Sequence, residues 1–230
     1  MLPEFAELIK NRRSTRAYTQ DRVERSVVER ICTAARMAPS GANLQPGAFH
    51  VLTGAALAAL TGDLKSASAD GTPIDLEYSY FPSPMSAALK ARQRAAGYAL
   101  YSALGIGRRD IAARRAQFDR NYEFFGAPVG IIVTIDRNMG KGCFMDLGMA
   151  VMGFLLAAES EGLGATGIGA IANYGPIVHQ HLGLPNDEMV VCGIALGHPD
   201  RDAAVNQFRT DRAALDEFTS FRGFEEEGTL

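Results

Sequence analysis

The sequence has few cysteines and no long apolar run, and each scarcity excludes a class of protein. Cys32, Cys143 and Cys192 are an odd number at wide spacing, which fits neither a disulfide framework nor a C-x-x-C metal site. A reducing compartment is the simpler interpretation, so we expect a cytoplasmic protein. The longest apolar runs, 127–135 and 147–158, are shorter than the about 18 residues that cross a bilayer. The amino terminus lacks the charged-then-apolar order of a secretory signal.

Tryptophan is absent, and neither charge nor histidine occurs in excess. The net charge is −3, from 23 Lys and Arg against 26 Asp and Glu, which predicts no general attraction to nucleic acid or to an anionic membrane. Of the four histidines only His179 and His181 are close together. They have no third ligand nearby, so we expect no metal site. The sequence also lacks a G-x-S-x-G elbow, a P-loop and an H-E-x-x-H pair.

What remains is the composition of an ordinary globular protein, with 47% hydrophobic and 21% charged residues over 230 positions. We predict a single domain over 1–230. Helical and β-like segments mix without a βαβ rhythm, which favours an α+β fold with a mostly antiparallel sheet flanked by helices. The predicted helices are about 5–11, 26–38 (from a Ser26–Glu29 capping box), 55–64, 85–125, 144–161 and 176–182. The predicted strands are about 49–52, 129–135, 165–171 and 189–196.

Two segments fall outside this regular pattern. Residues 66–87 are rich in Ser, Pro and Gly, and together with the basic helical stretch after them they indicate a lid or excursion over about 66–125. The tail at about 200–230 has little apolar periodicity. Such a tail needs a surface to lie against, and a second subunit would supply one.

The sharpest local signal is Asn11–Arg16, which reads N-R-R-S-T-R after the first predicted helix. Three guanidinium groups and two hydroxyls lie within five positions. Arginine forks bind phosphate oxygens bidentately, and a hydroxyl adds a short donor. The segment therefore indicates a phosphate site, although a solvated turn with surface arginines is the simpler alternative. A second pair, Arg209 and Arg212 in N-x-x-R-x-x-R, would complete such a site.

A second candidate is the loop Ala38–Pro46, A-P-S-G-A-N-L-Q-P. Two prolines and Gly41 hold an irregular backbone that a ligand could approach. Ser40, Asn43 and Gln45 offer neutral donors and acceptors to a planar, amide-like ring. The alternative is an ordinary helix-to-strand turn.

Gly162, Gly164 and Gly167 match the letters of the dinucleotide fingerprint G-x-G-x-x-G. That fingerprint requires a strand before it and a helix after it, whereas here a long helix precedes and a β-like run follows. We therefore expect Gly162 to cap the helix and Gly167 and Gly169 to bring backbone N–H groups against a flat ligand. An NAD-dependent Rossmann dehydrogenase remains the alternative.

Taken in order, these segments resemble the nitroreductase family of FMN enzymes. The motifs are N-R-R-S-T-R, P-S-G-A-N-L-Q-P, G-L-G before a strand, V-V-C-G-I-A-L-G-H-P and N-x-x-R-x-x-R, and they cover most of residues 5–215. The tail over 200–224 resembles the nitrobenzoate-reductase-like branch. The resemblance implies an α+β sandwich and an intertwined homodimer, with exchanged carboxy-terminal tails and two FMN sites at the interface.

The resemblance also implies roles for individual residues. The FMN phosphate and ribityl end would be held by Arg12, Arg13, Ser14, Arg16, Arg209 and Arg212. The other subunit would edge the isoalloxazine with Pro39, Ser40, Asn43 and Gln45. The backbone at Ile168, Gly169 and Ala170 would reach the ring, with one N–H aimed at flavin N5. Two departures concern the cavity over the flavin: many relatives have an aromatic residue at Gly47, and bulkier or acidic residues at Gly169 and Ala170.

The implied activity is ping-pong reduction of a nitroaromatic or quinone-like acceptor. NAD(P)H would give a hydride to flavin N5 and leave before the acceptor binds in the same space. Eight of the 23 basic residues lie between Lys90 and Arg120, which favours NADPH, although a solvated helical face explains them equally simply. No catalytic side chain is required. The alternatives are reductive dehalogenation or flavin reduction on the same fold, and a flavin-binding protein without turnover.

Overall fold

The computed structural model describes residues 3–224 and has one sheet at its centre. Its strand order is β1-β2-β4-β3, and every neighbouring pair is antiparallel. The strands are β1 (Ala48–Thr53), β2 (Val129–Asp136), β3 (Gly164–Ile168) and β4 (Glu188–Gly197). The predicted α+β class with an antiparallel sheet is confirmed.

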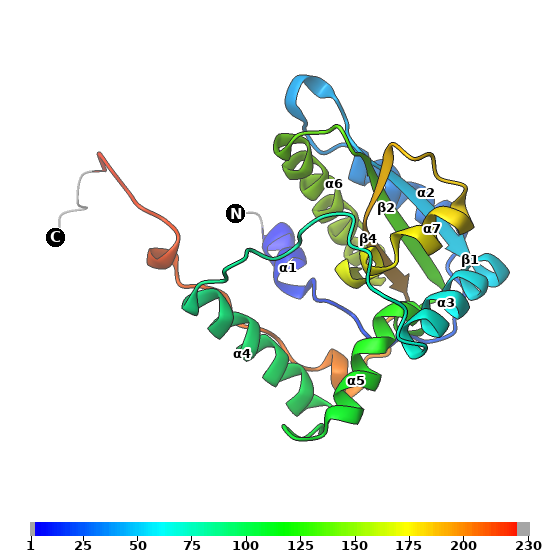
Figure 1. The fold of residues 1–230 in the computed structure, drawn as a ribbon. Helices are drawn as coiled ribbons and strands as arrows, with labels where there is room; N and C mark the ends of the chain where they lie inside the picture. Colours follow the sequence, from blue (N-terminus) through cyan, green and yellow to red (C-terminus); the bar gives the residue numbers. More distant parts are fainter. Residues whose placement is uncertain (1–2, 225–230) are drawn as a thin grey trace.

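Helices cover both faces of the sheet (Figure 1). They are α1 (Pro3–Asn11), α2 (Arg25–Arg36), α3 (Gly54–Ala69), α4 (Ala87–Ala103), α5 (Ile111–Asp119), α6 (Lys141–Ser160) and α7 (Gly175–Leu182). Side chains of β2 alternate between the faces: Ile131 packs in the core with α2 and α6, and Ile132 in the core with α3 and α7. Both side chains are fully buried, as expected for a central strand.

The turn after α6 explains why the glycine fingerprint does not bind a dinucleotide. Gly162 has a φ of +74°, the left-handed conformation that glycine adopts without a Cβ penalty. Leu163 N–H donates to the Ala158 carbonyl at 2.9 Å, and Gly162 N–H donates to Glu159 at 3.0 Å. These bonds end the helix in a Schellman turn. A helix therefore precedes the motif, and Gly164 and Gly167 lie within β3 itself. This is the reverse of the Rossmann order, and the predicted cap at Gly162 is confirmed.

Several predicted boundaries are wrong. The helix predicted over 85–125 divides into α4, α5 and a 3₁₀ segment over Arg120–Gly126. The strand predicted over 165–171 ends at Ile168 and continues as a 3₁₀ turn over Gly169–Asn173. The capping box at Ser26 is absent, because the helix already begins at Arg25 and no side chain caps it. The lid predicted from residue 66 begins later, because α3 continues to Ala69.

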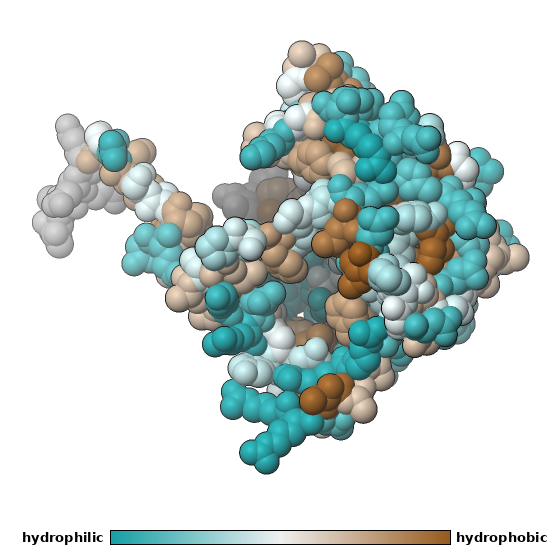
Figure 2. Space-filling view, in the orientation of Figure 1, coloured by the Kyte–Doolittle hydropathy of each residue, from teal (hydrophilic) through white to brown (hydrophobic). Residues whose placement is uncertain are grey.

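The segment from α4 to α5 stands away from the sheet, and the tail after β4 extends from the body of the molecule (Figures 1 and 2). The tail contacts α4 through an ion pair between Arg92 and Glu217, with 2.8 Å between nitrogen and oxygen. Apolar side chains along it remain exposed at Leu215, Phe218, Phe221 and Phe224. The rest of the predicted tail, residues 225–230, lies outside the described range.

Candidate functional site

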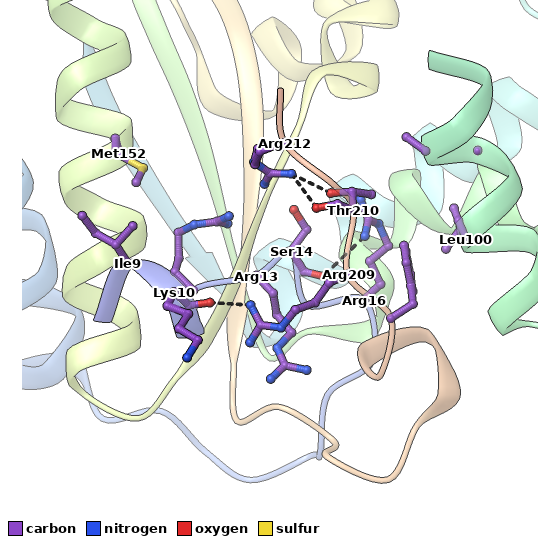
Figure 3. Close-up of a pocket in the computed structure, with 14 residues that line it drawn as sticks. Ile9, Lys10, Arg13, Ser14, Arg16, Leu100, Met152, Arg209, Thr210 and Arg212 are labelled. Atoms are coloured by element: carbon purple, nitrogen blue, oxygen red, sulfur yellow. Dashed lines mark hydrogen bonds between the residues drawn. The ribbon is translucent and has the colours of Figure 1, made fainter. Parts of the chain in front are cut away.

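Five arginines from opposite ends of the chain line one cavity of about 580 Å³. It lies between α1, α4, α6 and the segment that follows β4. Figure 3 shows Arg13, Arg209 and Arg212 close to Ser14 at its centre. The residues predicted to bind phosphate that line it are Arg12, Arg13, Ser14, Arg16, Arg209 and Arg212. The structure thus brings together the two arginine groups that the sequence separates by almost the whole chain.

The amino-terminal arginines lie beside the sheet because residues 12–16 run along the free edge of β3. Thr15 N–H donates to the Ala165 carbonyl at 3.3 Å, and Ser14 forms a parallel bridge with Ala165. The approach requires glycine at position 164, because a Cβ there would lie 2.8 Å from the Thr15 Cβ. Gly164 therefore acts in backbone packing, not in dinucleotide binding.

Asn206 joins the two arginine segments, and the sequence analysis assigned it no role. Its side chain accepts the Arg16 backbone N–H at 2.8 Å and donates to the carbonyls of Ala17 at 2.8 Å and Asp200 at 2.7 Å. Its own carbonyl accepts the Arg13 guanidinium at 2.6 Å. Asn206 is only 4% exposed. The signal that could have found it is the asparagine that opens N-x-x-R-x-x-R.

The described residues leave the positive charge of the five arginines without a paired carboxylate. Within residues 3–224 none of the five arginines forms an ion pair with a carboxylate. Burial lowers the pKa of Arg12, and the nearby charge of Arg212 lowers it further. Burial lowers the pKa of Arg16 as well. A guanidinium nevertheless stays protonated in a protein, so the cavity is built for an anion, and the donor set fits a phosphate monoester.

A second cavity, of about 490 Å³, lies farther along β3. The four steps from Ala165 to Gly169 cover about 13 Å of extended strand, so the strand leads from the arginines to this cavity. Gly169 and Ala170 line it on one side, and Tyr80 and Phe81 of the segment 70–86 line it on the other. Among the described residues that line it, none is charged. Its walls suit a planar aromatic ligand.

The predicted Ser40 loop is not brought to either cavity within this chain. Gly41 N–H donates to the Asp146 side chain at 3.0 Å near the start of α6, and none of residues 38–46 lines either cavity. Asn43 and Gln45 are exposed, and their φ angles of +56° and +49° are strained for non-glycine residues. That Pro39, Ser40, Asn43 and Gln45 serve a site in another subunit stays a prediction.

Gly47, one of the two departures from the family pattern, has a steric reason. Its φ is +81°, and a Cβ there would lie 2.8 Å from the Thr134 carbonyl oxygen. An aromatic side chain at this position would require the loop to move. The backbone conformation at position 47 therefore disfavours the aromatic side chain that many relatives have there.

The structure is an α+β fold with two cavities, one lined by arginines that suit a phosphate and one with uncharged, partly aromatic walls. A model of the nitroreductase family matches residues 9–198, and the chain belongs to that family.

Similar proteins cover nearly the whole chain. Chloronitrobenzene nitroreductase of Comamonas testosteroni is 37% identical and covers 95% of this chain and 97% of its own length. 4-Nitrobenzoate reductase of Pseudomonas putida is 34% identical, over 96% and 97%. The crystal structure of the FMN and NADPH-dependent nitroreductase NfnB from Sphigopyxis sp. strain HMH has a TM-score of 0.92 at 37% identity, over 95% and 99%. The FMN-dependent NfnB from Mycobacterium smegmatis in complex with NADPH has a TM-score of 0.91 at 30% identity, over 96% and 100%.

Proposed function

We propose that this chain is an FMN-dependent, NADPH-oxidising enzyme that reduces nitroaromatic compounds. The observation that carries the proposal is a pair of cavities: five arginines without carboxylate partners among the described residues line the first, and the second, at the far end of β3, is uncharged and partly aromatic. The names of the similar proteins support each part: the cofactor, the reductant and the nitroaromatic acceptor.

The residues of this chain bind and position the reactants. The arginines and Ser14 would hold the phosphate of FMN, and the backbone from Ile168 to Ala170 would lie along the ring. Bound FMN would supply the redox chemistry, taking up a hydride from NADPH and passing electrons to the nitro group. Tyr80 and Phe81 would provide apolar walls that exclude water from the acceptor. Backbone N–H groups beside the ring would stabilise negative charge that develops there.

The enzyme acts as a homodimer in this proposal, and α6 forms much of the interface. An 18-residue window of α6 has a mean hydropathy of 1.5, yet only 22% of it is buried within the chain. By length and composition such a helix could cross a membrane. However, Leu147 and Phe154 pack in the core, so only the opposite face of α6 is left for a partner to bury. Met145, Met149 and Met152 recur on that face at helical spacing and are 71%, 42% and 39% exposed.

A second copy seated on this face would give the remaining predictions a physical basis. It would cover the methionines of α6 and bring its Ser40 loop to the flavin of the first copy. Its surface would also accept the exposed phenylalanines of the tail at 200–224. A cytoplasmic location agrees with three unpaired cysteines among the described residues.

Removing one cavity arginine tests the phosphate site. Arg212→Ala should raise the dissociation constant of FMN by about ten- to a hundredfold, because a charge-assisted bond to phosphate contributes about 1.5–3 kcal/mol. The fold should remain intact, since among residues 3–224 the guanidinium hydrogen-bonds only to its neighbours Thr210 and Asp211. Titration of the apoprotein with FMN, followed by fluorescence, measures the change.

Arg25→Ala is the matched control, because Arg25 lies outside the cavity and pairs only with Glu29 at 2.7 Å. It removes the same charge and should leave FMN affinity unchanged. Equal affinity in the two variants would contradict the assignment of the phosphate site.

A further inference from the structure

The segment 70–86, which we call the strap, docks on the sheet where the strand pairing is irregular. Val133 of β2 pairs with Cys192, but the next residue, Thr134, pairs with Val190. Val191 therefore has no partner residue on β2, and β4 carries a β-bulge. A bulge leaves ladder N–H and C=O groups unpaired, and buried groups of this kind require partners.

Side chains of two consecutive strap residues form hydrogen bonds with backbone groups at the bulge. The Glu77 carboxylate accepts the Val190 backbone N–H, and the Tyr78 hydroxyl donates to the Val191 carbonyl at 2.7 Å. Burial raises the pKa of Tyr78, so this hydroxyl stays protonated and donates. A backbone bond from Asp75 N–H to the Asn173 carbonyl at 3.0 Å fixes the same stretch to the turn after β3.

Glu77 is also buried, and it forms an ion pair with Arg137 beside the His179 imidazole. Its side chain is 8% exposed and lies 2.8 Å from Arg137 and 3.0 Å from His179. This arrangement needs glycine at position 175, where a Cβ would lie 2.7 Å from Glu77 Oε1. A buried carboxylate is costly unless it is paired and hydrogen-bonded. The strap is therefore fixed at Glu77 by the residue that follows β2, by α7 and by β4 together.

Docking at Glu77 also positions Tyr80, three residues farther along the strap. The Tyr80 ring lies against Gly169, where a Cβ would be 3.2 Å from Tyr80 Cε2. Its ring centroid is 6.2 Å from that of Tyr78 and 4.9 Å from that of Phe81. The docked strap therefore fixes the aromatic wall of the second cavity.

We propose that Glu77 is a positioning residue for the acceptor: by docking the strap on the β4 bulge, it holds Tyr80 over Gly169 and so determines how well aromatic acceptors bind. This inference rests on the proposed function, because it places the flavin ring beside Ile168–Ala170. Glu77 itself lines neither cavity and acts through Tyr80.

The test replaces the carboxylate with an amide of equal size. Glu77→Gln loses the charge that pairs with Arg137, and the KM for nitrobenzene should rise at least fivefold. The FMN dissociation constant and the rate of anaerobic flavin reduction by NADPH should stay unchanged, because the arginine cavity is untouched. Turnover with ferricyanide, which has no aromatic ring, should also stay unchanged. Glu123→Gln is the control, since Glu123 is paired with Lys65 at 2.8 Å outside both cavities, and it should leave the nitrobenzene KM unaltered.

A double-mutant cycle with Tyr80→Leu tests the proposed route. Tyr80→Leu alone should raise the nitrobenzene KM, and adding Glu77→Gln should then have no further effect. Arg137→Gln, a milder change at a residue with 38% side-chain exposure, should raise the KM in the same direction and keeps the test open if Glu77→Gln fails to fold.

An unchanged nitrobenzene KM in Glu77→Gln or Arg137→Gln, fully additive effects in the cycle, or loss of FMN binding would overturn the positioning role. If the unmodified protein fails to bind FMN or to be reduced by NADPH, the proposed function itself has failed, and the two failures are therefore distinguishable.

Discussion

Replacing Asn206 with alanine is expected to release the flavin and to destabilise the fold. The substitution leaves three partly buried backbone groups without these partners, those of Arg16, Ala17 and Asp200. Each costs about 1–3 kcal/mol, so we expect a loss of roughly 3 kcal/mol or more in the free energy of unfolding. The segment with Arg13 and Arg16 is then no longer fixed to the segment with Arg209 and Arg212. FMN affinity should fall by more than about a hundredfold, because several charge-assisted bonds weaken together.

The measurements are chemical denaturation of the apoprotein and titration with FMN. Gln207→Ala is a matched control that removes the neighbouring amide, which is exposed and donates only to the Arg201 carbonyl. It should change neither stability nor affinity appreciably. An Asn206→Ala protein that binds FMN as tightly as the control would show that Asn206 does not hold the site together.

The second large effect is expected at α6. Met149→Glu places a charge in the middle of the exposed apolar face, where association would bury it without a partner. Burying an unpaired carboxylate costs several kcal/mol per ion, and a symmetric interface would bury two of them. The variant should therefore run as a single chain of 24.7 kDa in light scattering, whereas the unmodified protein should have twice that mass.

The same variant should lose FMN, because the Ser40 loop would no longer reach the flavin of a partner. Ala59→Glu is the control, as it adds the same charge on the exposed side of α3. It should remain a dimer with flavin bound. A Met149→Glu protein that keeps the dimer mass would contradict the assignment of this face, and a monomer that keeps its FMN would contradict a shared site.

The sequence was sufficient to predict structure where the pattern lies within one short segment. The β-branched run at Val129–Ile135 predicted a buried strand, and the strand is buried. The sequence N-R-R-S-T-R predicted a phosphate site, and its arginines line a common cavity with Arg209 and Arg212. In these cases the residue types of one short segment indicate its structure or its ligand, so the prediction needs no knowledge of contacts with distant segments.

The features that the sequence analysis missed depend on contacts between residues far apart in the chain. Ile171 continues an apolar run, yet β3 ends at Ile168, because β4 pairs with it only to Gly193. Glu77 lies in a segment that looked like an irregular lid, and its role depends on a bulge more than a hundred residues away. Asn206 likewise bonds to residues at the opposite end of the chain. No window of sequence contains both partners of such a contact.

The central claim is that this chain holds a flavin that NADPH reduces and a nitroaromatic compound reoxidises. The most direct test is the absorbance spectrum of the FMN-loaded protein under anaerobic conditions, first after NADPH and then after nitrobenzene. We predict that the flavin band near roughly 450 nm bleaches with NADPH and returns with nitrobenzene. A protein that takes up no FMN, or whose flavin band NADPH leaves unchanged, would contradict the account.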